Sequence, residues 1–162
     1  MRDNKRRVLK TVLIILTVFQ LAFIFSQSLF DAPSSTEESS TVLEIVKPIF
    51  ELFVGKGNVT ENLVRKCAPF AEFAVLGALT AALARLYGTR RCLRYVFALL
   101  CCLAAAVADE SIQLISDGRS AEVRDVLIDL AGAAAGVAVA IVLTAVIKRI
   151  KGSIKNEKRN EN

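Results

Sequence analysis

The sequence predicts an all-α integral membrane protein with four transmembrane helices. Three observations lead to this fold class: 54% of the residues are hydrophobic, the mean hydropathy is +0.48, and the apolar residues gather in four runs long enough to cross a bilayer. The predicted spans cover about residues 8–29, 67–86, 93–110 and 126–147. We expect a single membrane domain over residues 1–162.

The first predicted span could instead be a cleavable signal peptide, because the basic segment 1–10 precedes it. Two features argue against cleavage. The apolar stretch has about the 20 residues that a bilayer requires, and no small-x-small cleavage pattern follows it cleanly. We therefore expect the first span to be retained.

The loop between the first two spans, residues 30–64, is acidic, with six acidic and two basic residues. Inside it, apolar residues such as Val42, Ile45 and Ile49 recur at helical spacing. This pattern predicts an extracytoplasmic amphipathic segment that lies on the bilayer or packs over the bundle. The segment either covers the ends of the spans or acts as a lid over a substrate.

The basic residues predict the orientation. Of the 21 Lys and Arg residues, 15 fall in the N-terminal segment, in the loop 85–94 and in the basic tail 148–162. The positive-inside rule places these segments, and with them both termini, in the cytoplasm. Because the charges flank apolar segments, the net charge of +5 indicates contact with membrane lipids rather than with nucleic acid.

This topology brings ionisable residues from three spans to the outer membrane face. The candidate polar site consists of Arg65, Lys66, Glu72, Asp109, Glu110, Gln113, Arg119, Asp125 and Asp129. A charge inside a bilayer costs about 3 kcal/mol, so Glu72 and Asp129 should turn inward and pair with the basic residues nearby, including Arg124. The cluster either binds or processes a ligand, or forms ion pairs that only fix the helix register.

Two glycines follow the acidic residues on the same face of the predicted fourth span. Gly132 and Gly136 have the spacing at which small residues let a neighbouring helix approach closely, so we predict a role in helix packing. On this interpretation both positions tolerate Ala better than Leu or Ile.

The residue types present argue against several kinds of site. The chain has no His, which removes the commonest acid–base residue near neutral pH and the commonest zinc ligand. Its four Cys residues are expected to act as small hydrophobic residues rather than as a disulfide framework. The sequence predicts no metal and no cofactor, and it identifies no catalytic residue.

Two blocks of the sequence resemble the signature blocks of VanZ-like membrane proteins. The blocks are RKCAPFAEF at 65–73 and DESIQLISDGRSAEVRDVLIDLAGAAAG at 109–136. They occur in the family's order and at similar spacing. The matching residues are Arg65, Lys66, Phe70, Glu72, Asp109, Glu110, Gln113, Gly118, Arg119, Asp125, Asp129, Gly132 and Gly136.

Two positions depart from the family pattern, because Pro69 and Ile112 stand where the family has histidines. The predicted topology places both at similar depth, so the family histidines could be neighbours. If they carry proton transfer or bind a metal, this chain lacks that chemistry. If they form a structural contact, Pro69 at a helix start and Ile112 among apolar side chains can replace it, which is the interpretation we favour.

The resemblance implies a multi-pass protein of the bacterial cytoplasmic membrane. The founding member of the family is linked to low-level resistance to teicoplanin, a lipoglycopeptide that acts on the outer side of that membrane. The first hypothesis is therefore a protein that binds a lipid-linked cell-wall precursor, another lipid-linked envelope component or a lipoglycopeptide. Arg65, Lys66 and Arg119 would then hold anionic groups such as phosphate.

Two other hypotheses remain open at this point. The protein could be a membrane enzyme that acts on a lipid-linked substrate, with Glu72, Asp109 or Glu110 as general base. It could also be a structural or assembly partner whose polar cluster is a scaffold. The loss of both histidine positions makes enzyme activity the least favoured of the three.

Overall fold

The computed structural model describes residues 2–30, 61–88, 90–115 and 122–160. These residues form four α-helices and no strand: α1 (Arg2–Phe30), α3 (Glu61–Leu86), α4 (Arg91–Ile115) and α5 (Val123–Asn160). Each helix contains a stretch long and apolar enough to cross a membrane, which confirms the predicted all-α fold with four spans. The amphipathic segment predicted between the first two spans lies outside the described residues.

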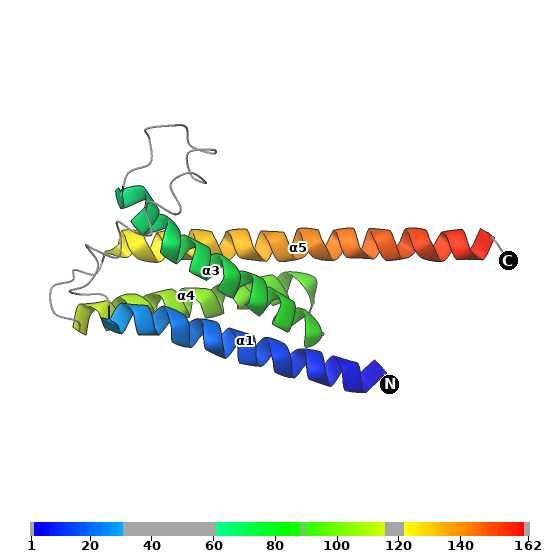
Figure 1. The fold of residues 1–162 in the computed structure, drawn as a ribbon, viewed down its shortest axis with the longest axis horizontal. Coiled ribbons are helices and arrows are strands. Elements are labelled where there is room, and N and C mark those ends of the chain that lie inside the picture. Colours follow the sequence, from blue (N-terminus) through cyan, green and yellow to red (C-terminus); the bar gives the residue numbers. More distant parts are fainter. Residues whose placement is uncertain (1, 31–60, 89, 116–121, 161–162) are drawn as a thin grey trace.

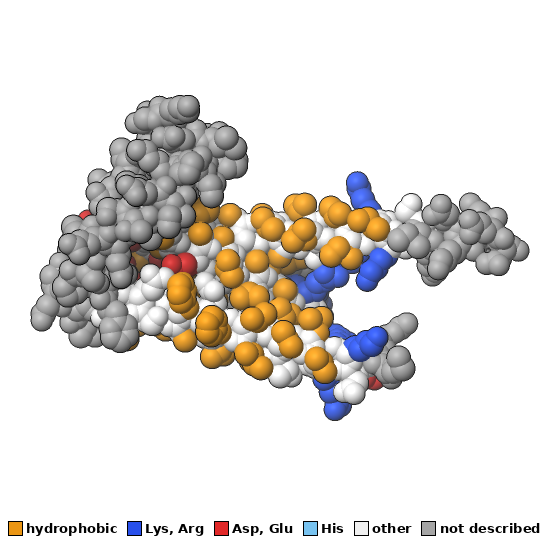
Figure 2. Space-filling view, in the orientation of Figure 1, with side chains coloured by type: hydrophobic (Ala, Val, Ile, Leu, Met, Phe, Trp, Pro, Cys, Tyr) orange, Lys and Arg blue, Asp and Glu red, His pale blue; other side chains and the backbone are white. Residues whose placement is uncertain are grey.

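The helices alternate in direction, so the two chain termini lie at the same end of the bundle (Figure 1). The C-terminal ends of α1 and α4 meet the N-terminal ends of α3 and α5 at the opposite end, which we call the polar end. Lys and Arg side chains gather at the end that carries the termini, and apolar side chains cover the middle of the bundle (Figure 2).

Much of the apolar surface points outward. Only 6% of the span in α1 and 28% of the span in α4 is buried inside the bundle, and large side chains such as Phe19 and Leu127 are mostly exposed. In a bilayer these side chains contact lipid tails, so burying them against one another brings little further stabilisation.

The longest helix is α5, with 38 residues. At 1.5 Å per residue it measures about 57 Å, nearly twice the ~30 Å of a hydrocarbon core. It continues beyond the predicted span end near residue 147 and through the basic tail to Asn160. The sequence analysis treated this tail only as a charged segment. It contains no Pro, and Lys, Arg and Glu favour helix, so the helix has no reason to stop earlier.

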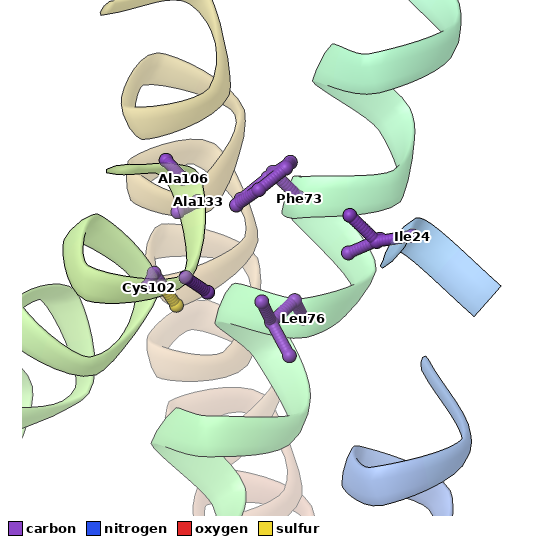
Figure 3. Close-up of a cluster of buried hydrophobic side chains, with 7 residues drawn as sticks. Ile24, Phe73, Leu76, Cys102, Ala106 and Ala133 are labelled. Atoms are coloured by element: carbon purple, nitrogen blue, oxygen red, sulfur yellow. The ribbon is translucent and has the colours of Figure 1, made fainter. Parts of the chain in front are cut away.

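The interior of the bundle is a small apolar cluster to which all four helices contribute (Figure 3). Its buried members are Ile24, Phe73, Leu76, Cys102, Ala105, Ala106 and Ala133. Four of the seven are Ala or Cys, and such small side chains allow the helices to approach each other closely.

The closest helix pair is α3 with α5, and glycines make this approach possible. A methyl group added at Gly132 would overlap the carbonyl oxygen of Phe70, and one added at Gly136 would overlap that of Ala74. The two backbones therefore touch without side chains between them. The space is smaller than the sequence analysis expected, because it excludes even the methyl group of Ala.

A third glycine takes part in this contact from the other helix. A methyl group at Gly77 on α3 would overlap the carbonyl oxygen of Ala133 on α5. The sequence analysis did not identify Gly77. Its signal was present, because Gly77 is the one glycine between residues 58 and 87, and Ala81 follows it at small-xxx-small spacing.

Candidate functional site

The polar end of the bundle holds a cluster of acidic side chains from three helices. Asp109 and Glu110 near the end of α4 are 6% and 7% exposed, and Asp129 on α5 is 3% exposed. Glu72 on α3 is half-buried. Asp129 interacts electrostatically with the other carboxyl groups of the cluster: Asp109, Asp125, Glu110 and Glu72. The structure thus brings together all five acidic residues of the predicted site.

Asp109 has hydrogen-bond donors on both of its carboxylate oxygens. The buried hydroxyl of Ser28 on α1 donates to Oδ1 at 2.5 Å, and Nε2 of Gln113 donates to Oδ2 at 3.0 Å. Gln113 also donates to the hydroxyl oxygen of Ser28 at 3.4 Å. Asp109 and Gln113 therefore share a helix face, as their spacing indicates, and the third member of the network comes from another helix.

Glu72 is held by two glutamines of α1. Nε2 of Gln27 donates to Glu72 Oε1 at 2.8 Å, and Nε2 of Gln20 donates to the backbone carbonyl oxygen of Glu72 at 3.1 Å. Gln20, Gln27 and Ser28 were not among the residues predicted for the site. Polar side chains within a span usually face the bundle interior, and Gln20 and Gln27 are seven residues apart on one helix face, so the signal was present.

Glu110 lies against the start of α5. Its Oε1 accepts a hydrogen bond of 2.6 Å from the backbone N–H of Glu122, the residue before the helix begins at Val123. The first N–H groups of a helix lack partners within that helix, and the helix dipole is positive there. This position provides a favourable partner for a buried carboxylate.

Asp129 differs from these three residues. No hydrogen bond from the described part of the chain reaches its buried Oδ1. The side chain of Arg124, one of its expected partners, is exposed. The other expected basic partners, which are Arg119 and the side chains of Arg65 and Lys66 on α3, lie outside the described part.

The two positions where the family has histidines are both helical. Ile112 is half-buried on α4. Pro69 lies inside α3, well after its start at Glu61, so the expectation that it occupies the first turn of the helix is wrong. The helix begins earlier than the predicted span, since residues 61–66 are also helical. Pro69 has no N–H, so the backbone carbonyl of Arg65 lacks its usual helical donor.

The described part of the site is a set of hydrogen-bond acceptors in a low-dielectric setting. The amide and hydroxyl groups of α1 and α4 satisfy Glu72 and Asp109, and the start of α5 satisfies Glu110. Oδ1 of Asp129 lacks a donor among the described residues, so a group that donates a hydrogen bond can be held there. Within the described residues, no three acidic or Cys side chains are grouped so as to hold a metal ion.

Comparison with known proteins identifies a family. A family model described as VanZ/LLP1 matches residues 10–144, a region that includes parts of all four helices and every residue of the candidate site. Neither the curated proteins nor the solved structures gave a match. Because the family model covers most of the 162 residues, this multi-pass membrane protein belongs to the VanZ/LLP1 family.

Proposed function

We propose that the protein binds the headgroup of a lipid-linked envelope component or of a lipoglycopeptide at the outer face of the bacterial cytoplasmic membrane, and that this binding changes glycopeptide sensitivity. The observation that carries the proposal is the buried polar cluster around Asp129. Several carboxyl groups are withdrawn from water at one end of a bundle that is otherwise apolar. Polar groups in this position are unfavourable unless they have a partner.

The position of the cluster fits a headgroup. The acidic cluster lies near the ends of the spans, so it is closer to the membrane interface than to the bilayer centre. The positive-inside pattern of the Lys and Arg residues supports an orientation in which the polar end faces the outer side. Exposed apolar side chains along the helices offer contact to the acyl chains of the same ligand.

The basic residues of the site extend this proposal. Arg65 and Lys66 on α3 and Arg119 supply cationic groups that could bind phosphate or another anion of the ligand. A headgroup with both an anionic and a donor group would then contact both halves of the site.

A structural role is the second candidate, and one observation favours it. Glu72 and Asp109 already accept hydrogen bonds from side chains of the bundle itself. A scaffold needs no further ligand for these two residues. A purely structural role does not explain why the buried Oδ1 of Asp129 has no donor among the described residues, and we therefore favour binding.

The test is complementation of a deletion strain. Cells that lack the protein are supplied with the wild type, with Arg119→Ala or with Glu122→Gln, and the inhibitory concentration of teicoplanin is measured together with the amount of membrane-inserted protein. Glu122 is an exposed acidic residue at the same end and serves as the matched control.

Binding predicts that deletion changes teicoplanin sensitivity, that Glu122→Gln restores it, and that Arg119→Ala fails at a normal protein level. If Arg119→Ala fails only because the protein is lost from the membrane, the scaffold function is correct. An altered cell-wall precursor in the extracts of deleted cells would support an enzyme instead.

A further inference from the structure

The buried carboxylates of the polar end are not equally satisfied. Gln27 donates to Glu72, Ser28 and Gln113 donate to Asp109, and the backbone N–H of Glu122 donates to Glu110. Asp129 is the most deeply buried of the cluster, at 3% exposure, yet its Oδ1 has no donor within the described residues. A buried acceptor without a partner loses its hydration and gains nothing in return.

The charges around Asp129 determine which partner suits it. Among the described residues, its electrostatic neighbours are Glu72, Asp109, Glu110 and Asp125, which are all acidic. An anionic group would be repelled at this position, whereas a positively charged group would be attracted by the surrounding acidic side chains, and the buried Oδ1 requires a hydrogen-bond donor. A cation that also donates hydrogen bonds satisfies both requirements.

The chemical form of this cation follows from the geometry. The described side chains do not form a group of three ligands for a metal ion. An organic ammonium needs fewer ligands, because one carboxylate oxygen can accept one of its three N–H bonds. Asp129 lies six residues after the first residue of α5, about 9 Å along the helix. Asp129 therefore lies in the first third of the candidate span, which begins at Val123 on the side of the polar end.

We propose that Asp129 binds the primary ammonium group of an outer-leaflet phospholipid. This rests on the proposed function in one respect, that the polar end faces the headgroups of the outer leaflet. It adds the chemical group that the site recognises, and it assigns that group to one oxygen atom.

The experiment compares three headgroups on the full-length protein. The protein is placed in nanodiscs that contain equal amounts of phosphatidylethanolamine, phosphatidylcholine and phosphatidylglycerol with identical acyl chains, and retained lipids are counted by native mass spectrometry. Phosphatidylcholine keeps the positive charge but has no N–H, whereas phosphatidylglycerol has no cation. We expect retention of phosphatidylethanolamine to exceed that of either competitor by about tenfold, the effect of one charge-assisted hydrogen bond.

The variants test the assignment to Asp129. Asp129→Asn keeps the shape of the side chain and removes its charge, and it should abolish the preference for phosphatidylethanolamine. Glu122→Gln removes one negative charge from an exposed position at the same end of α5 and should keep the preference. An unchanged preference in Asp129→Asn would overturn the assignment.

The wild-type comparison needs no variant, so it stands even if Asp129→Asn fails to fold. Equal retention of the three lipids by the wild type would overturn the inference. This failure is distinct from a failure of the proposed function. Teicoplanin sensitivity can depend on the protein without any headgroup preference, and a headgroup preference can exist in a protein whose deletion leaves sensitivity unchanged.

Discussion

The hydroxyl of Ser28 on α1 donates a 2.5 Å hydrogen bond to Oδ1 of Asp109 on α4, and both residues are buried. The two residues are 81 positions apart in the chain. A hydrogen bond to a charged acceptor in a low-dielectric interior is among the stronger polar contacts in proteins. It therefore fixes the register of α1 against α4 at the polar end.

Removing this hydroxyl should destabilise the bundle. We expect Ser28→Ala to lower the free energy of unfolding by about 1.5–3 kcal/mol, because the buried Oδ1 of Asp109 then loses the hydrogen bond from the Ser28 hydroxyl. Reversible unfolding in detergent measures this loss. Ser26→Ala is the matched control, since its hydroxyl bonds the carbonyl of Phe23 in its own helix. Equal losses in the two variants would show that the contact between α1 and α4 contributes nothing.

The glycines between α3 and α5 should not tolerate even a methyl group. We expect Gly132→Ala and Gly136→Ala each to lower the free energy of unfolding by about 1–3 kcal/mol, because the added carbon overlaps a backbone oxygen that cannot rotate away. The control is Gly152→Ala on the same helix, where the added methyl meets no other atom within 4 Å. Gly152→Ala should be neutral or stabilising by up to about 1 kcal/mol, because Ala favours helix.

Pro69 should destabilise the helix that contains it. Because Pro69 lies inside α3, we expect Pro69→Ala to stabilise the folded bundle by up to about 3 kcal/mol, since the substitution restores a backbone N–H. The midpoint of unfolding in detergent checks this. A lower midpoint would mean that the folded bundle depends on the missing N–H at Pro69 and would contradict this expectation.

The two positions where the family has histidines can be tested by substitution, with Pro69→Ala as the reference for the loss of the proline. Pro69→His must be compared with Pro69→Ala, because both restore the same N–H. If the histidines form a structural contact, the double variant Pro69→His with Ile112→His should be more stable than the sum of the single changes predicts. A new activity without such coupling would indicate chemistry instead.

The orientation of the protein has a direct test. A reporter fused after Asn162 should be active only in the cytoplasm, and one inserted near Ser35 only outside, because the basic segments determine the topology. If the reporter after Asn162 is active outside, the polar end faces the cytoplasm, and the proposed site at the outer leaflet is wrong.

The fold was predictable from the sequence because the bilayer imposes a simple requirement on each span. Four long apolar runs sufficed, and the four helices confirm them. The shared helix face of Asp109 and Gln113 was also predictable, because it follows from helix periodicity, which is a local property.

The partners across helices were less predictable. Gln27 and Ser28 are polar residues near the end of the first span. No feature of the neighbouring sequence indicates which helix they contact. Their contacts with Asp109 and Glu72 depend on how α1 is placed against α3 and α4, which is a property of the whole bundle. Likewise, the spacing of Gly77 and Ala81 indicates a close helix contact, but only the packed bundle shows that the partner of Gly77 is Ala133 of α5.

The backbone contact between α3 and α5 also determines how the polar end could open. Two helices that touch through glycines have no side chains that could rearrange between them, so we expect them to move as one rigid unit. Among the described residues, α1 contacts α3 and α4 but not α5, so α1 is the helix that can swing away with the least disruption. Gln27 and Ser28 would leave Glu72 and Asp109 in the same movement. Opening would thus remove one hydrogen-bond donor from each of two carboxylates at once and make the exposed interior more attractive to a cation at the moment when one could arrive.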